Sequence, residues 1–136
     1  MTTLSLKTLL VPSKSVDVEY PGMPDFVVSV TFLSRESMQT MRKKATKTTY
    51  KKHQPVEEID DTLFLELYVK STINGWKGLK LKYLEQLAPV DLSGQDLEAE
   101  LEYSEENALY LIKNSSAFDS FVNEQVTDLG KFSNNK

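Results

Sequence analysis

Alternation of apolar and polar residues predicts β-structure in the first third of the chain. The clearest run, Val28-Ser29-Val30-Thr31-Phe32, lies within a predicted strand over Phe26–Leu33. Further strands are predicted at Thr3–Val11 and, as a short middle strand, at Val16–Tyr20. Segments that contain Pro and Ser or Gly separate the three. A small N-terminal antiparallel sheet is therefore expected.

Helical periodicity follows this region. Ser34 suits the N-cap of a helix that begins at Arg35 and runs into the forties. Its apolar face carries Met38, Met41 and Ala45, which recur at helical spacing. Beyond it, residues 53–55, His-Gln-Pro, are interpreted as an exposed linker, because Pro55 ends any helix before it.

The second half of the chain has the strongest helical signals. A helix is expected over Asp60–Ile73, with acids at its start and Asn74-Gly75 as its left-handed C-terminal cap. A shorter helix is expected over Leu79–Leu87. Ser104 and Ser116 each match the N-cap pattern of a further helix.

Length and composition favour one globular domain. The chain has 136 residues, 40% of them hydrophobic and 26% charged. We expect a single α+β domain over residues 1–136, mainly helical with a small N-terminal antiparallel sheet. Within it, residues 1–33 form the β-rich part, 34–132 the helical part and 133–136 a flexible tail.

The charges are unevenly distributed along the chain. Sixteen Lys and Arg residues against twenty Asp and Glu residues give a net charge of −4, which disfavours nucleic acid as a partner. Seven positive charges and one negative charge lie between Arg35 and Lys52. Seven acids and no basic residue lie between Asp91 and Glu106. The two blocks could pair within the chain or between copies, or each could be a solvated surface.

Few residues support catalysis or metal binding. The chain has no Cys and one His, His53, which lies in a Lys-rich segment beside Pro55. A nucleophilic triad and a zinc site both need more than this. The acids at Asp60-Asp61 are explained by their position at a helix start, and the glycine spacing fits no phosphate-binding loop. We therefore expect a protein that is not an enzyme and has no cofactor or metal.

The sequence also predicts a location. No run approaches the roughly 20 apolar residues that span a membrane. The segment from Met1 to Pro12 lacks the pattern of a secretory signal. A cytoplasmic location without membrane contact is expected.

Trp76 is the only tryptophan and follows the strongest predicted helix. It could fold back and fix that helix to the next one. Alternatively it could anchor a partner, since Trp is enriched at interface hot spots. Both roles are compatible if the partner is a second copy.

Six short segments follow one another in a fixed order along the second and third parts of the chain. They are Arg42-Lys43-Lys44-Ala45-Thr46-Lys47, Gln54-Pro55-Val56-Glu57-Glu58, Phe64-Leu65-Glu66, Trp76-Lys77-Gly78-Leu79, Tyr103-Ser104-Glu105-Glu106-Asn107-Ala108 and Phe118-Asp119. This order resembles the tail assembly chaperones of long-tailed bacteriophages. The similarity covers about Ser34 to Phe132, and its most specific part is the Trp-Lys-Gly turn followed downstream by a Ser-Glu-Glu-Asn helix start.

The resemblance implies a non-catalytic protein of virion morphogenesis in the host cytoplasm. Such a protein escorts the tape measure protein, a long helical chain, helps to recruit tail tube subunits and is not expected in the mature virion. The resemblance also implies self-association as an oligomer and a longer frameshifted form. Two other interpretations stay open: a small structural or connector protein of the virion, and an acidic inhibitor of a host protein.

We predict partner contacts at the basic helix and at the tryptophan. The Met side chains offer an adaptable apolar surface, and opposite charge blocks suit head-to-tail association. Arg42, Lys43, Lys44 and Lys47 are therefore expected to meet acids in the Asp96–Glu106 region of a neighbouring copy. The predicted partner-binding residues are Met38, Met41, Arg42, Lys43, Lys44, Lys47 and Trp76.

Overall fold

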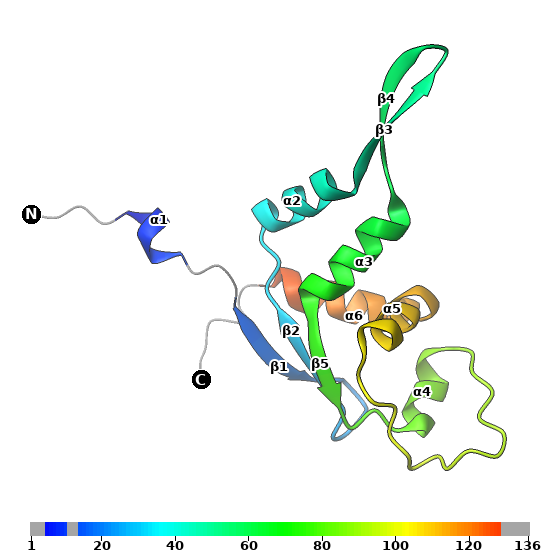
Figure 1. Ribbon diagram of the computed structural model, residues 1–136. Helices are drawn as coiled ribbons and strands as arrows, with labels where there is room; N and C mark the ends of the chain where they lie inside the picture. The colour runs from blue at the N-terminus through cyan, green and yellow to red at the C-terminus, as the bar shows by residue number, and fades with distance from the viewer. Residues whose placement is uncertain (1–4, 11–13, 129–136) are drawn as a thin grey trace, which may run out of the picture.

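A computed structural model of the chain describes residues 5–10 and 14–128 (Figure 1). Along these residues, strands and helices are interspersed up to Lys77, three helices follow, and two antiparallel sheets form. The elements are α1 (Leu6–Leu9), β1 (Ser15–Glu19), β2 (Val27–Thr31), α2 (Arg35–Ala45), β3 (Thr46–Lys51), β4 (Gln54–Ile59), α3 (Asp61–Thr72), β5 (Ile73–Lys77), α4 (Leu81–Leu87), α5 (Glu105–Asn114) and α6 (Ser116–Thr127).

A three-stranded sheet of order β1-β2-β5 lies at the centre of the fold. The central strand β2 pairs antiparallel with β1 and with β5, and its register with β5 shifts between Ser29 and Val30. Val28 and Val30 point into the core and are fully buried, as strand alternation requires. Helices α3 and α6 pack against β2, and α5 packs against both of these helices.

An aromatic cluster joins the sheet to the last helix. Phe26 precedes β2, Phe118 and Phe121 lie on α6, and both Phe26 and Phe118 have no exposed surface. The Tyr20 ring lies 4.6 Å from that of Phe121 and 5.5 Å from that of Phe26, between ring centroids. These distances are typical of favourable aromatic pairs. The N- and C-terminal parts of the chain therefore share one core.

Side-chain caps begin four of the helices. Ser34 accepts a hydrogen bond from the backbone N–H of Ser37, which confirms the predicted start of α2. Ser104 caps α5 in the same way, as predicted. The last helix differs by one residue, because Ser115 and not Ser116 provides the capping oxygen. Asp60 caps α3 by accepting from the N–H of Leu63.

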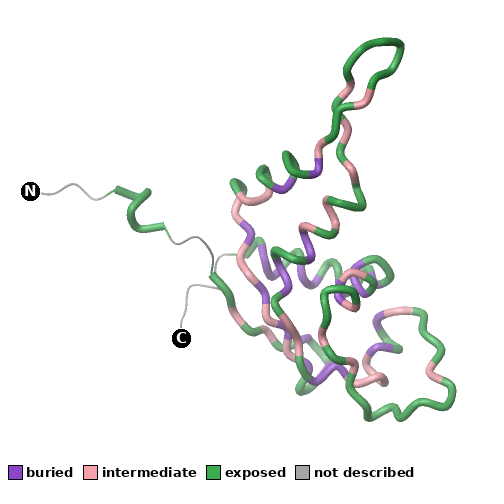
Figure 2. Tube along the Cα trace, viewed as in Figure 1, coloured by how far each residue is buried: buried purple, intermediate pink, exposed green. Residues whose placement is uncertain are grey.

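Strands β3 and β4 form a hairpin that extends α2 and α3 outward, away from the core (Figure 1). Its two-residue turn, Lys52-His53, has φ angles of +52° and +67°. Within residues 46–59, no side chain is buried and none belongs to the hydrophobic core or packs against it (Figure 2). The predicted linker at residues 53–55 is therefore wrong, since Gln54 and Pro55 begin β4.

The predicted fold, mainly helical with one small N-terminal sheet, is also wrong. The structure is a mixed α+β fold with two antiparallel sheets. The third strand of the central sheet comes from the middle of the chain, because Asn74 and Gly75 lie within β5 and do not cap α3. The C-cap of α3 is Ile73, in extended conformation, so the chain passes directly from helix to strand.

The predicted strand at Thr3–Val11 is wrong where the structure describes it. Leu6–Leu9 form one helical turn, α1, which stands apart from the rest of the fold (Figure 1). Residues 3, 4 and 11 of that prediction lie outside the described residues, as does the predicted tail at 133–136. The predicted strands at Val16–Tyr20 and Phe26–Leu33 are confirmed as β1 and β2, each with slightly different ends.

Candidate partner-binding site

The structure separates the predicted partner-binding residues into exposed and enclosed side chains. Met41 is 5% exposed and belongs to the core, and Met38 is partly buried against it. Arg42, Lys43 and Lys44 in the last turn of α2 are exposed. The methionine face of α2 therefore packs inward, and its basic face remains at the surface.

Trp76 is partly buried and packs against the core, at a distance from the basic residues. Its indole Nε1 donates a hydrogen bond of 2.9 Å to the backbone oxygen of Leu101. Its ring meets those of Tyr103 and Phe118 edge to face, at centroid distances of 5.2 and 6.1 Å. Trp76 is paired with Val28 at the start of β2, whereas α2 follows the end of that strand. It fixes β5 to the segment before α5.

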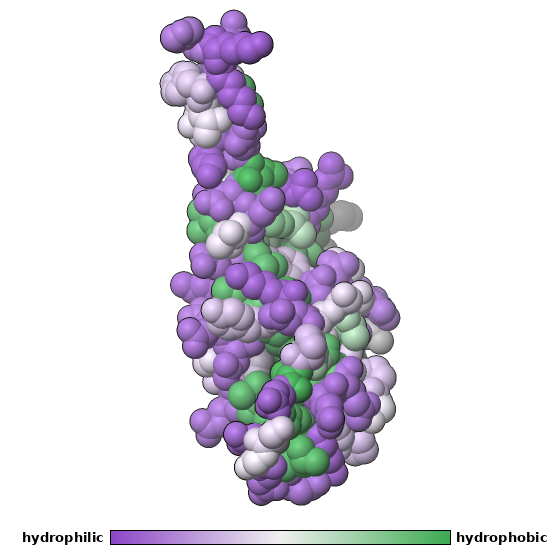
Figure 3. Space-filling view, turned by 90° about the vertical axis from the view of Figure 1, so that its right-hand side faces the viewer, coloured by the Kyte–Doolittle hydropathy of each residue, from purple (hydrophilic) through white to green (hydrophobic). Residues whose placement is uncertain are grey.

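The exposed basic residues continue from α2 along β3. We call residues 42–59, which comprise the end of α2 and the hairpin, the arm. Lys47 is exposed on β3, directly opposite Glu58 on β4. Lys51 Nζ lies 2.9 Å from Glu58 Oε1, and this hydrogen bond and charge lower the pKa of Glu58. The arm is mostly hydrophilic and projects from one end of the molecule (Figure 3).

The hairpin has two unlike faces, because side chains alternate along each strand. On one face, the Tyr50 face, the opposed pairs are Tyr50–Pro55, Thr48–Glu57 and Thr46–Ile59. On the other, the Lys47 face, they are Lys47–Glu58, Thr49–Val56 and Lys51–Gln54. Tyr50 is 74% exposed and Ile59 is 44% exposed, so large apolar side chains stand in solvent on the Tyr50 face.

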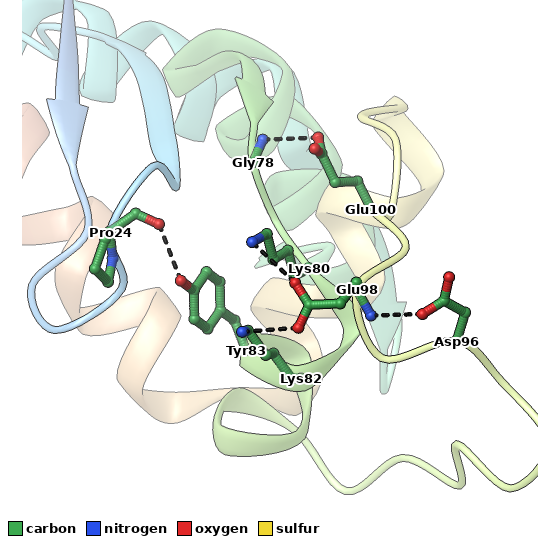
Figure 4. Close-up of polar contacts among 8 residues, drawn as sticks. All are labelled: Pro24, Gly78, Lys80, Lys82, Tyr83, Asp96, Glu98 and Glu100. Carbon is green, nitrogen blue, oxygen red and sulfur yellow. Dashed lines mark hydrogen bonds and ion pairs between the residues drawn. The ribbon is translucent and has the colours of Figure 1, made fainter.

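Part of the acidic block is bound within the chain. Glu98 forms ion pairs with Lys82 at 2.8 Å and Lys80 at 3.1 Å (Figure 4). The hydrogen bonds from Lys82 and Lys80 lower the pKa of Glu98. Glu100 accepts a hydrogen bond of 3.1 Å from the backbone N–H of Gly78. These two acids fasten the loop after α4 to the start of that helix.

Most of the acidic block lies in the loop after α4, at the opposite end of the molecule from the hairpin. The hairpin projects at one end, and α4 with its following loop lies at the other (Figure 1). Within one copy the structure therefore does not bring the basic arm and the acidic segment together. Glu102, Glu105 and Glu106 are exposed, and in the described part of the chain they form no ion pair.

Two further features complete the surface. An open groove of about 450 Å³ lies between α3 and α5, where Val69 and Leu109 are flanked by charged residues of both signs. His53 is exposed at the hairpin turn.

Among residues 5–10 and 14–128, no group of three or more His, Cys, Asp or Glu side chains is placed to hold a metal ion. None of the helices described is long and apolar enough to cross a membrane.

Sequence reasoning missed the hairpin and the exposure of Tyr50. A signal was present in the β-branched run before Tyr50, which favours a strand. The groove between α3 and α5 had no signal, because it depends on how two helices pack.

Comparison with known proteins places the chain in a family. No curated protein and no solved structure matches it. A family model described as YdaY prophage protein matches residues 31–136, which include the arm and every element from α2 to α6. The chain therefore belongs to the YdaY prophage protein family and is phage-derived.

Proposed function

We propose that this phage-derived protein is a non-catalytic assembly chaperone of the phage tail. In this role it binds the tape measure protein in the host cytoplasm, helps to recruit tail tube subunits and leaves before the particle is complete. The segment order that resembles tail assembly chaperones supports this function, and the family supports the phage origin. The observation that carries it is the arm, which offers a binding surface outside the core.

The arm suits reversible binding. Arg42, Lys43, Lys44 and Lys47 are exposed, and none of them forms an ion pair in the part of the chain described. Unpaired surface charges speed encounter with an acidic partner and add modest affinity. Ala45 is the buried residue of the arm, and no core side chain lies within residues 46–59. A partner that binds the exposed side chains of the arm therefore moves no core side chain, and the body of the protein stays folded during binding and release.

Self-association follows from the same surface in this proposal. The four basic residues face solvent on the arm, and Glu102, Glu105 and Glu106 are exposed just before and at the start of α5. Contact between these unlike surfaces joins copies head to tail. Reversal of the four basic charges should reduce the light-scattering mass to that of a monomer; an unchanged mass would refute this contact.

Mass spectrometry of infected-cell lysate and of purified virions tests the function. We expect the protein to co-purify from lysate with the tape measure and tube proteins and to be absent from virions. Abundance in virions would identify a structural component instead and would overturn the proposal.

A charge-reversed variant then tests the surface. Substitution of the four arm residues by Glu should abolish the co-purification. The matched control reverses four exposed lysines outside the arm, Lys7, Lys14, Lys70 and Lys77, and should retain it. Equal loss in both variants would mean that net charge matters and the arm does not.

A further inference from the structure

The two edges of the hairpin are not equivalent. In an antiparallel pair, opposed residues alternate between those bonded to each other and those whose backbone groups point outward. Asp60 donates its backbone N–H to the oxygen of Ala45 at 2.8 Å, which fixes the bonded set. The bonded pairs are then Lys47–Glu58, Thr49–Val56 and Lys51–Gln54. The outward residues are Thr48 and Tyr50 on β3 and Pro55, Glu57 and Ile59 on β4.

Pro55 protects one edge only. Proline has no backbone N–H, and it occupies an outward position of β4 next to the turn. Proline at such a position disfavours the addition of another strand, because one of the outward N–H donors is missing. The β3 edge has no proline, and Thr48 and Tyr50 form no backbone hydrogen bond to any other described element. The β3 edge is therefore open, whereas the β4 edge is blocked.

The side chains along β3 specify what fits beside it. Lys47 and Lys51 stand on one face, where Lys51 also pairs with Glu58, and Tyr50 stands on the other. A strand placed against β3 would carry alternate side chains beside the lysines and beside the tyrosine. Acidic residues fit the first set of positions and apolar residues fit the second. A two-stranded hairpin is only marginally stable alone, so a third strand would also stabilise the arm.

We propose that the β3 edge binds an extended segment of a partner protein as a third strand, in which acidic and apolar residues alternate. The inference goes beyond the proposed chaperone function and does not depend on which tail protein supplies the segment. Backbone groups of Thr48 and Tyr50 pair with the segment, while Lys47 and Lys51 select its acids.

Two segments of a second copy fit less well. A second β3 would bring Lys47 and Lys51 of both chains together, and like charges repel across a strand pair. The acidic segment at residues 96–103 has the right alternation, but Leu101 N–H and Ala99 C=O are already bonded to Leu79 and Leu81. The free backbone groups of this segment are therefore those of Glu98, Glu100 and Glu102. If these groups bonded to Thr48 and Tyr50, the three carboxylates would lie on the same face as the Tyr50 ring. A different protein is the better occupant.

A synthetic peptide provides the probe. The peptide DLEAELEY has the sequence of residues 96–103 and alternates acidic and apolar residues. As a free peptide it can bond to β3 through the backbone groups of either its acidic or its apolar residues. The control peptide DEEELALY has the same composition without the alternation. Fluorescence anisotropy of the labelled peptides with the full chain should show at least tenfold tighter binding of the alternating peptide. Equal affinity, or no binding of either, would overturn the proposal.

Proline substitutions identify the edge. Thr48→Pro removes an outward N–H of β3 and should weaken binding at least tenfold, whereas Thr48→Ala should not. Glu57→Pro is the matched control, because Glu57 opposes Thr48 on the blocked edge, and it should bind as the unmodified protein does. Loss in both proline variants, or in neither, would contradict the assignment.

A charge variant leaves the backbone donors of β3 in place. Lys47→Gln with Lys51→Gln removes both positive charges without placing a new carboxylate beside Glu58. It should also weaken binding at least tenfold, and a smaller effect would overturn the predicted selection of acids. Self-association through the basic residues of the arm should survive Thr48→Pro. If Thr48→Pro abolishes self-association, a second copy occupies the edge and the proposal is wrong.

Discussion

Three glycines allow steric overlap to be separated from backbone strain. Gly78 joins β5 to α4 with a φ of +75°. A Cβ at Gly78 would overlap the carbonyl oxygen of Asp25 and lie 2.6 Å from its carbonyl carbon. Gly94 has a similar φ of +77° but open space around it, and Gly75 has open space without a positive φ. Alanine at Gly78 therefore tests steric overlap together with backbone strain, and alanine at Gly94 tests backbone strain alone. Alanine at Gly75 involves neither and serves as the control.

The structure gives an order of magnitude for each substitution. Left-handed backbone costs alanine about 1–2 kcal/mol, offset by about 0.5 kcal/mol from the reduced entropy of the unfolded chain. Gly94→Ala should thus lower the free energy of unfolding by about 1 kcal/mol. At Gly78 the overlap must also move the turn that precedes the fully buried Phe26, or break the 3.1 Å hydrogen bond from Gly78 to Glu100. Gly78→Ala should therefore cost about 3 kcal/mol or more. Gly75→Ala should be neutral or stabilise by about 0.5 kcal/mol.

Urea unfolding followed by the fluorescence of Trp76, the only tryptophan, measures these differences. The expected order of stability is Gly75→Ala, then Gly94→Ala, then Gly78→Ala, with similar urea dependence in all three. A Gly78→Ala variant within about 1 kcal/mol of Gly94→Ala would refute the reasoning, because the overlap with Asp25 would then have no consequence.

Further predictions concern a tyrosine, the tryptophan and the hairpin turn. Burial raises the pKa of Tyr68 to about 12. The contribution of the neutral Tyr68 to the free energy of unfolding is therefore complete below pH 10, and about 2–3 kcal/mol of it is lost between about pH 10 and 12. Tyr68→Phe should flatten this part of the stability profile in urea titrations at alkaline pH. Trp76→Phe removes the hydrogen bond to Leu101 and should destabilise the fold by about 1–3 kcal/mol, yet leave co-purification with tail proteins unchanged. Asn-Gly in place of Lys52-His53 suits the positive φ angles. This replacement should raise the free energy of opening the hairpin by about 1 kcal/mol, measured from cross-strand contacts in NMR.

Local signals in the sequence were sufficient for the helix starts. Ser34 and Ser104 have capping oxygens that bond within the next turn, so their role depends on neighbouring residues alone. The hairpin was missed because its turn, Lys52-His53, lacks the Asn or Gly that normally adopts a positive φ. Asn74-Gly75 was misassigned because the same dipeptide suits a helix cap, and only pairing with β2 makes it part of a strand.

For a similar reason, the sequence defined the exposure of the candidate residues only in part. Periodicity shows that Met38 and Met41 share a face of α2 but does not show whether that face meets the core or a partner. The packing of α2 against α3 decides this, and Met41 is buried. The charges of Arg42, Lys43 and Lys44 were located correctly at the surface, since solvation favours exposed charge. The open β3 edge depends on strand register, which the sequence did not define.

The hairpin, residues 46–59, has no contact with the core, so its loss can be separated from loss of the fold. Stability in a protein is divided among local units, and a unit without core contacts can open alone. Backbone amides of β3 and β4 should therefore exchange with solvent long before those of β2, which lies at the centre of the fold. A protease that cuts after Lys51 or Lys52 in the exposed turn would inactivate the arm and leave the body intact. The host cell could thus contain folded protein that has lost its capacity to bind.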